Sequence, residues 1–381
     1  MSGGVRIAAL LAGVATLASA RPDGDDRRVR LELGAEPGPG GFARATAPRR
    51  FELPRDHGPH FEYQTEWWYY TSNLLAADGR RFAFQLTFFR RGLTPGAPPA
   101  GAGLSTNQVY FAHFAITDVD TRRHAFAERF ARGAGGLAGA QSEPFAVWLE
   151  DWRAGAANAD GSAVRLVARD GPIALDLALE ARKPLVAHGD RGLSAKSAEP
   201  GNASYYVGYT RLAARGRLVA GGQDVPVSGE AWFDHEWSTS ALGAGAVGWD
   251  WFSLQLGDER EVMYFQIRKQ DGSVETMSGG TLVERDGDAR RLTRADVALE
   301  VLDRWRSPET GAVYPSRWRL RVPGEGLDLI VEPRLRAQEM RTSFIYWEGA
   351  VAVTGTAGTR PVSGQGFVEL TGYARSMRDI F

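Results

Sequence analysis

Cysteine is absent from this chain of 381 residues. Its absence excludes disulfide bonds, thiol nucleophiles, thiolate metal ligands and a cysteine-linked lipid anchor. The folded state must therefore be stabilised by packing and hydrogen bonding.

A strong excess of charge of either sign is also absent. The chain has Lys+Arg 45 and Asp+Glu 46, which gives a formal net charge of -1. Domains that bind nucleic acid or anionic membrane surfaces usually carry a basic excess. We therefore expect a small or neutral partner and no nucleic acid.

The motifs of several enzyme classes are missing as well. The chain has no Gly-x-Ser-x-Gly elbow and no phosphate-binding loop, and the histidine spacing of a zinc protease does not follow His235. His57 and His60 are spaced like a metal pair, but the Gly-Pro between them indicates a turn, and no third ligand stands at a recognisable spacing. We therefore predict no metal and no other cofactor.

Long apolar runs are confined to the first twenty residues, "MSGGVRIAALLAGVATLASA". Arg6 precedes an apolar run over residues 7–17, and small residues end the segment at Ala20, which is typical of a secretory signal peptide. The run is too short for a transmembrane helix, which needs about 20 residues. We predict a signal peptide over residues 1–20 with cleavage after Ala20, a secreted or periplasmic protein, and no transmembrane segment. The alternative is a short buried N-terminal helix.

The rest of the chain is rich in short aromatic and β-branched runs. Residues 82–89, 109–119 and 262–267 are examples, and Gly, Asp-Gly and Pro separate such runs. This pattern predicts many antiparallel strands and an all-β sandwich or barrel, with helical periodicity only near residues 293–301.

The chain also repeats itself. Residues 67–90 align with 249–268, matching Trp67 to Trp249, Tyr69 to Trp251 and Gln85 to Gln266, and residues 226–237 align with 361–372. Two matches in the same order favour an internal duplication, although chance similarity between β-rich segments would look alike. After an N-terminal extension over 21–50, we predict a first domain over 51–241 and a second over 242–381.

Alternation along a strand divides the stretch "EWWYY" into two faces. Glu66, Trp68 and Tyr70 share one face, and Trp67 and Tyr69 share the other. Because the second copy repeats the bulky pair, we interpret Trp67 and Tyr69 as architecture common to both copies.

The copies differ on the other face. Asp250 stands where the first copy has Trp68, and Leu370 stands where the first copy has His235. His235, which shares its face with Trp237, is a candidate acid, base or ligand-orienting group, or else a structural histidine whose hydrogen bonds are satisfied. His113 lies in an apolar run, where it is either a ligand contact or a core histidine.

Four motifs together resemble a known family. "EWWYYTSNL", "GEAWFDHEW", "GWDWFSLQL" and "YWEGAVAVTG...GQGFVELTGYA" are similar to the secreted AttH-type proteins, which are related to carotenoid 1,2-hydratase, also called hydroxyneurosporene synthase. The resemblance runs from about Pro54 to Ala374. It implies two tandem lipocalin-like β-barrel or sandwich domains. Many members of this family are labelled predicted hydrolases.

The resemblance also implies a chemistry. The hydratase relatives add water across an isoprenoid double bond, which requires a proton donor, exclusion of bulk water and electron-rich ring faces. Approximately, the acid and the histidine of these relatives fall on Asp250 and His235.

We therefore expect three catalytic residues, with Asp250 or Glu66 as the acid and His235 holding the water. The expected ligand contacts are Trp68, Tyr70, Trp237, His113 and Phe252, which is the counterpart of Tyr70.

Two functions stay open at this point. One is acid-assisted hydration of a C=C bond in a lipophilic, for example isoprenoid, small molecule. The other is non-catalytic binding or transport of a hydrophobic ligand in the periplasm. The identity of the ligand and the oligomeric state stay open as well.

Overall fold

The computed structural model describes residues 41–98, 105–240 and 242–377, all of which belong to one compact unit, Leu31–Phe381. The predicted signal peptide and the first part of the N-terminal extension lie outside the described residues. The regular secondary structure of the described chain is almost entirely strand, which confirms the all-β prediction. Short 3-10 helices are η1 (Arg55–His57), η2 (Arg294–Asp296) and η3 (Pro323–Glu325).

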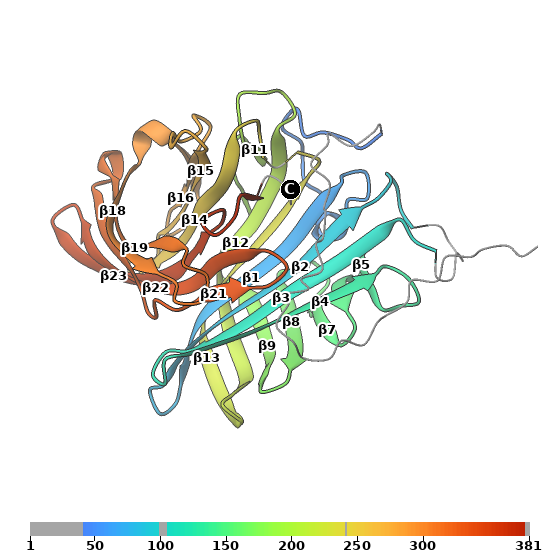
Figure 1. The fold of residues 1–381 in the computed structure, drawn as a ribbon, viewed down its shortest axis with the longest axis horizontal. Coiled ribbons are helices and arrows are strands. Elements are labelled where there is room, and N and C mark those ends of the chain that lie inside the picture. Colours follow the sequence, from blue (N-terminus) through green and yellow to red (C-terminus); the bar gives the residue numbers. More distant parts are fainter. Residues whose placement is uncertain (1–40, 99–104, 241, 378–381) are drawn as a thin grey trace, which may run out of the picture. The chain divides into compact units, whose positions relative to one another are not determined.

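The strands form two antiparallel sheets, and each curls into a barrel or half-barrel (Figure 1). The first sheet has the order β4 (Arg123–Arg132), β3 (Gln108–Asp118), β2 (Arg81–Gly92), β1 (Thr65–Ala76), β13 (Gln223–Ser238), β12 (Ala203–Ala220), β9 (Ile173–Ala181), β8 (Ala163–Asp170), β7 (Trp152–Ala156), β6 (Phe145–Leu149) and β5 (Ala138–Ser142). Two short strands, β10 (Val186–Ala187) and β11 (Leu193–Ala195), pair with β12.

The second sheet repeats this arrangement. Its order is β17 (Ala289–Thr293), β16 (Gly279–Val283), β15 (Glu261–Lys269), β14 (Ala246–Leu256), β23 (Arg360–Leu370), β22 (Ile345–Ala357), β20 (Leu327–Pro333), β19 (Val313–Val322) and β18 (Ala298–Arg306), with β21 (Glu339–Arg341) beside β22. In both sheets the first strand pairs with the second and with the last, so β1 corresponds to β14, β13 to β23 and β12 to β22. This shared order supports the predicted duplication into two lipocalin-like barrels.

Two details differ from the sequence analysis. The segment near residues 293–301 forms η2 and the start of β18 rather than a longer helix. The match of Gln85 to Gln266 is wrong, because Thr71 pairs with Gln85 whereas Asp250 pairs with Gln266. The hairpin β1–β2 extends further beyond its aromatic start than β14–β15, and this shifts the alignment.

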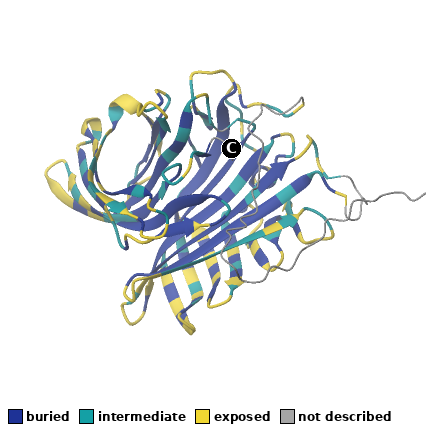
Figure 2. Ribbon diagram, in the orientation of Figure 1, coloured by how far each residue is buried: buried dark blue, intermediate teal, exposed yellow. Residues whose placement is uncertain are grey.

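Burial distinguishes the strands between the sheets from the outer ones (Figure 2). Strand β1 is buried at nearly every position, whereas β9 and β18 alternate between buried or half-buried and exposed residues. Each barrel has its own apolar core, and a third cluster, with Tyr69, Tyr206, Trp251 and Phe265, joins the two sheets. Both faces of the joining strands are therefore buried, as expected for a sheet covered on both sides.

A buried ion cluster also connects the sheets. Glu261 on β15 accepts hydrogen bonds from Lys183 (2.8 Å) and from Arg211 on β12 (2.6 Å), and Arg211 also contacts Glu230 on β13 (2.6 Å). These contacts hold β12 and β13 against β15. Among the described residues, no helix has the length and apolar character needed to cross a membrane.

The first sheet ends at Ser238 and the second begins at Ala246. The division at 241/242 remains a prediction, because the contacts join both sheets in one compact unit.

Candidate functional site

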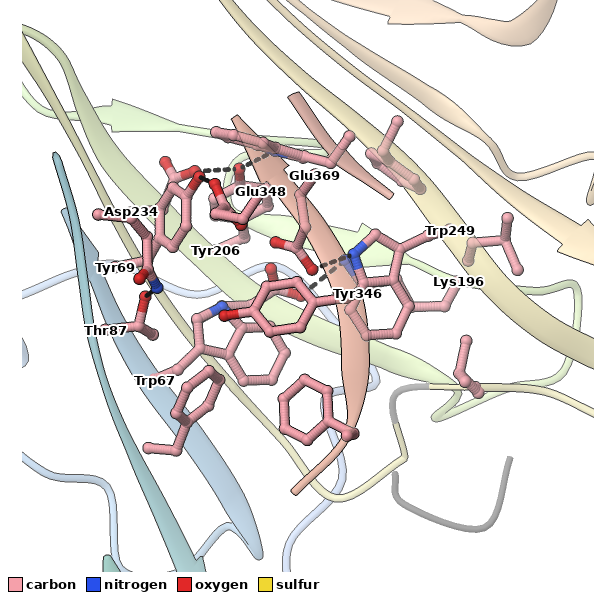
Figure 3. Close-up of a pocket in the computed structure, with 18 residues that line it drawn as sticks. Trp67, Tyr69, Thr87, Lys196, Tyr206, Asp234, Trp249, Tyr346, Glu348 and Glu369 are labelled. Carbon is pink, nitrogen blue, oxygen red and sulfur yellow. Dashed lines mark hydrogen bonds and ion pairs between the residues drawn. The ribbon is translucent and has the colours of Figure 1, made fainter. Parts of the chain in front are cut away.

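A cavity of about 90 Å³ lies between the two sheets (Figure 3). Its walls come from corresponding strands of the two copies, β1, β2, β12 and β13 on one side and β14, β15, β22 and β23 on the other. Trp67 and Tyr69 face it from β1, and Trp249 and Trp251 face it from β14. Residues two apart on a strand share a face, so each aromatic pair reaches the cavity together.

The central polar feature of the cavity is a pair of carboxyl groups, Glu348 and Glu369. The two residues are direct partners in the pairing of β22 with β23. Tyr69 Oη donates to Glu348 Oε1 (2.6 Å), and Trp249 Nε1 donates to Glu369 Oε1 (2.9 Å). Glu348 Oε2 is buried and makes no hydrogen bond to any described residue. One oxygen of Glu348 is thus fixed by a donor and the other is free to carry a proton.

Burial and mutual repulsion keep this pair from ionising fully. Burial, and then the charge of Glu369, raise the pKa of Glu348 well above its ordinary range, against the hydrogen bond from Tyr69. Burial also raises the pKa of Glu369, and the hydrogen bond from Trp249 opposes this shift. Both shifts favour the protonated form, so this pair keeps a proton to a higher pH than two exposed carboxyl groups would.

Asp234 is a third acidic group of the cavity. It accepts hydrogen bonds from Tyr206 Oη (2.7 Å) and Trp232 Nε1 (2.9 Å), and Trp251 Nε1 donates in turn to Tyr206 Oη (3.0 Å). Burial raises the pKa of Asp234 to about 8 in spite of these donors, and the neighbouring Glu236 raises it as well.

An ion pair borders the same space. Lys196 Nζ lies 2.6 Å from Glu236 Oε1 and 4.8 Å from the ring centroid of Phe265. Ser204 also donates to Glu236. Because Lys196 already neutralises Glu236, the protons available in the cavity come from its other carboxyl groups. The site can therefore hold a neutral carboxylic acid against electron-rich rings.

The copies differ at one position that matters for this chemistry. Asp234 pairs with Gly208 across β13 and β12, while its counterpart Glu369 pairs with Glu348. A Cβ atom on Gly208 would stand 2.5 Å from Asp234 Oδ1, so the glycine leaves room for that carboxyl group. One copy thus has glycine where the other has an acid.

The eight residues predicted from the sequence lie elsewhere: among the described residues that line this cavity, none is one of them. The cavity is lined by the face of Trp67 and Tyr69, opposite to the face that the sequence favoured. Trp68 and Tyr70 belong to the core of the first barrel and Phe252 to that of the second. Their roles as ligand contacts remain predictions.

Glu66 and His235 do meet, inside the first barrel. His235 Nε2 lies 2.9 Å and His60 Nδ1 2.8 Å from Glu66 Oε1, and Arg90 Nε donates to Glu66 Oε2 (2.8 Å). Burial raises the pKa of Glu66, but the charge of Arg90 and the histidine hydrogen bonds together lower it well below its ordinary value. Trp237 stacks on His60 at 3.7 Å between centroids. The cluster is therefore held as an ionised carboxylate with its partners.

The atoms of His60, Glu66 and His235 that could bind a metal ion lie within 4.8 Å of one another, which makes these residues the nearest approach to a metal-ligand set in the described chain. In the structure these atoms are joined by hydrogen bonds, and the guanidinium of Arg90 holds the second carboxylate oxygen. A cation beside the carboxylate opposes the binding of a metal ion.

Asp250 has a different set of partners in the second barrel. It accepts hydrogen bonds from Gln266 Nε2 (2.9 Å), Arg268 Nε (2.9 Å) and Tyr373 Oη (2.9 Å). These partners are separate from those of His235, so the structure does not bring the predicted acid and histidine into one hydrogen-bonded group. The catalytic roles of Asp250, His235 and Glu66 remain predictions.

His113 lies beside the cavity, as the direct strand partner of the lining residue Thr87. It is fully buried, and its Nδ1 lies 2.8 Å from the hydroxyl of Tyr346, which does line the cavity.

The carboxyl groups of the cavity were not among the residues predicted from sequence, although the sequence contains one sign of them. Asp234 and Glu369 occupy the same place in the aligned segments 226–237 and 361–372, next to aromatic strands in both copies.

Comparison with known proteins identifies the family. The sequence model described as AttH-like matches residues 44–373, most of the chain. The chain belongs to the AttH-like family. An AttH protein from Nitrosomonas europaea is 32% identical, with a TM-score of 0.78 over 87% of this chain and 100% of that one. Kievitone hydratase from Nectria haematococca is 15% identical, with a TM-score of 0.67 over 88% of this chain and 98% of that one, which shows a shared fold. No curated protein matches the sequence of this AttH-like chain.

Proposed function

We propose that this AttH-like protein adds water across a C=C bond of a lipophilic small molecule, for example an isoprenoid, in the cavity between the two sheets. The observation that carries the proposal is the Glu348–Glu369 pair, in which the unbonded Glu348 Oε2 belongs to an acid kept neutral among aromatic rings (Figure 3). A neutral carboxylic acid in an apolar site is the form that a general acid requires.

The reaction balances with the groups present. The proton of Glu348 forms a bond to the less substituted alkene carbon, and the C=C π electrons supply that bond. The other carbon becomes a tertiary carbocation, which the oxygen of a water molecule attacks. The added water then releases one proton, so the product differs from the substrate by one water and Glu348 is restored by one proton.

The walls of the cavity suit this intermediate. Trp67, Trp249 and Trp251 present indole rings to the space in which the cation would form. A cation over an aromatic face gains about 2 kcal/mol when water is excluded. The rings thus favour the transition state more than the neutral alkene, which is the condition for catalysis.

The size of the cavity limits what it can hold. One water molecule needs about 10 to 15 Å³ of cavity volume. A cavity of about 90 Å³ therefore has room for more than one water, as the reacting end of an alkenyl chain together with a water molecule requires. A hydratase among the similar structures has the same fold, and the chemistry proposed for this chain rests on its own cavity.

The test is incubation of the purified protein with linear isoprenoid alkenes and detection of a product heavier by one water. Glu348→Gln keeps an oxygen acceptor for Tyr69 but has no acidic proton, so we expect turnover to fall by roughly 10² to 10⁴ while ligand affinity is retained. Glu332→Gln, an exposed change on β20, is the matched control. Undiminished turnover in Glu348→Gln would show that Glu348 is not the general acid.

The same assay tests the residues predicted from sequence. If Asp250→Asn or His235→Ala abolishes turnover and Glu348→Gln does not, the reaction belongs to those residues and not to the cavity acids.

Non-catalytic binding of a hydrophobic ligand is the second candidate, because a cavity lined mainly by aromatic and other apolar side chains, with polar groups between them, is typical of binding sites. Native mass spectrometry of gently extracted protein should then reveal a bound lipid, with no product from any alkene in wild type. A protein that is purified without bound lipid, and whose tryptophan fluorescence does not change when lipids are added, would exclude the binding function.

We also propose that the protein is exported, on the strength of the signal-peptide pattern in residues 1–20. N-terminal sequencing of the protein from the periplasmic fraction should begin at Arg21. Full-length chain confined to the cytosolic fraction would refute export.

A further inference from the structure

Three side chains from three strands form a chain of hydrogen bonds that ends at the cavity. His113 on β3 lies 2.8 Å from the hydroxyl of Tyr346 on β22 through Nδ1, and 2.8 Å from Glu128 Oε1 on β4 through Nε2. Ser343 donates to Glu128 through both its backbone N–H (2.8 Å) and its hydroxyl (2.6 Å). The order is carboxylate, imidazole, hydroxyl.

The partners fix the direction of the donors. Burial raises the pKa of Glu128, but the hydrogen bonds that it accepts from His113 and Ser343 lower it overall, so Glu128 is an ionised acceptor. In the neutral imidazole of His113, Nε2 therefore carries the hydrogen and Nδ1 accepts from the hydroxyl of Tyr346. A carboxylate that sets the tautomer of an imidazole beside a hydroxyl is the arrangement through which serine hydrolases move a proton.

The three residues also span the distance from the cavity to solvent. Tyr346 lines the cavity and lies two residues from Glu348 on the same face of β22 (Figure 3). His113 has a fully buried side chain, and the side chain of Glu128 is 17% exposed. A proton that leaves Tyr346 through His113 thus arrives at a group that water reaches.

The first barrel provides a comparison. Gly208 on β12 and Glu348 on β22 are counterparts, because each pairs with the corresponding acid of the neighbouring strand. Two residues earlier on the same strands, Tyr206 is therefore the counterpart of Tyr346. Tyr206 donates to Asp234, a buried group inside the cavity, whereas Tyr346 bonds to His113 and through it to Glu128. Of this tyrosine pair, Tyr346 has the route outward, which a contact that only joins the sheets would not require.

We propose that Tyr346 is the second acid–base group of the cavity and that His113 and Glu128 are positioning residues that relay its proton to solvent. The proposal rests on the proposed hydration for the reaction that it serves. As water bonds to the carbocation, its proton passes to the oxygen of Tyr346 while the phenolic proton passes to Nδ1 of His113. Nε2–H then releases a proton through Glu128 to solvent, and solvent returns one proton to the cavity acid. Exchange with solvent moves the remaining ring proton of His113 from Nδ1 back to Nε2, which restores the starting tautomer.

The relay can be measured without a substrate. In protein carrying tyrosine labelled with ¹³C at Cζ, in mixed H₂O and D₂O, a slowly exchanging hydroxyl gives two signals and a rapidly exchanging one gives an average. We expect rapid exchange at Tyr346, and exchange slower by about tenfold or more in His113→Gln and Glu128→Gln, because general acid–base catalysis of the transfer is lost. Tyr346→Phe assigns the signal.

Tyr69 is the internal control, because its hydroxyl donates to Glu348 rather than to a histidine. Its exchange should be the same in wild type and His113→Gln. Glu128→Gln keeps an acceptor for His113 at a partly exposed position. It therefore tests the relay even if the fully buried change His113→Gln prevents folding. Equal exchange at Tyr346 in wild type and both folded variants would overturn the relay.

Turnover separates the relay from the proposed function. With linear isoprenoid alkenes, Tyr346→Phe and His113→Gln should lower kcat by roughly 10²-fold with KM within about twofold of wild type. If Glu348→Gln abolishes hydration while both relay variants keep full kcat, the relay is wrong and the hydration stands. If wild type hydrates no alkene, the hydration is wrong, and the exchange measurement alone decides whether the route exists.

Discussion

Replacement of Asp234 by asparagine should change how the stability of the protein depends on pH. The carboxyl group of Asp234 is 3% exposed, and burial raises its pKa from an ordinary 3.8 to about 8. Between these two values the folded protein holds a proton that the unfolded chain has released. The stabilisation is therefore complete below the lower value and is lost as the pH rises toward the upper one.

The magnitude follows from the size of the shift. One pKa unit corresponds to about 1.4 kcal/mol, so titration across the whole window from 3.8 to about 8 removes roughly 6 kcal/mol of unfolding free energy. Asp234 is surrounded by Tyr206, Trp232, Glu236, Lys196 and the neutral His188. The pKa values of Glu348 and Glu369 are raised as well, so these two groups also make the unfolding free energy fall as the pH rises. The difference between wild type and variant isolates the contribution of Asp234.

Denaturant unfolding between about pH 5 and about pH 7 measures this difference. Asp234→Asn should flatten the fall in unfolding free energy by about 1.4 kcal/mol per pH unit, the value for one proton. Loss of one acceptor in the amide lowers stability equally at every pH and leaves the slope unaffected. Asp224→Asn, an exposed change on the same strand, should match wild type. Equal slopes in Asp234→Asn and wild type would refute the reasoning.

Two further predictions concern other buried carboxyl groups. Glu66→Gln should lower the unfolding free energy by roughly 3 to 5 kcal/mol, because it leaves the guanidinium of Arg90 buried without its counter-charge. In the same denaturant unfolding experiment, the control Glu62→Gln, at an exposed site, should stay within about 0.5 kcal/mol of wild type. Equal losses of unfolding free energy in the two variants would contradict the prediction. Trp249→Phe removes the donor to Glu369 and should raise the pKa of that carboxyl group by roughly one unit in a ¹³C titration. An unchanged titration would show that this hydrogen bond does not act on the ionised form.

Alternation along single strands was enough to predict the two faces of β1. It separated Glu66 and Trp68 from Trp67 and Tyr69, and the comparison between copies showed which pair was repeated. It did not show which face meets a ligand, because both faces of β1 are buried, one in the first barrel and the other against the second sheet. Conservation of an aromatic pair between copies therefore indicated a shared cavity wall as well as shared architecture.

The pairing between distant strands could not be predicted in the same way. Glu348 and Glu369 become partners only when β22 and β23 align, and Tyr69 reaches Glu348 only when the sheets pack. His113 gave no sign of its partners, since Glu128 is on the next strand and Tyr346 is more than two hundred residues away in the sequence. Contacts of this kind depend on register and packing rather than on local patterns.

The matched strands around the cavity have one more consequence. Because β1, β2, β12 and β13 correspond to β14, β15, β22 and β23, the site has an approximate two-fold relation between its walls. A symmetric homodimer of single barrels would present identical walls, with every group duplicated. Fusion into one polypeptide frees the halves to diverge, so that Gly208 can stand opposite an acid in one half while Glu348 adds a second carboxyl group in the other. An asymmetric reaction needs a donor on one side only, and a single chain can encode that difference.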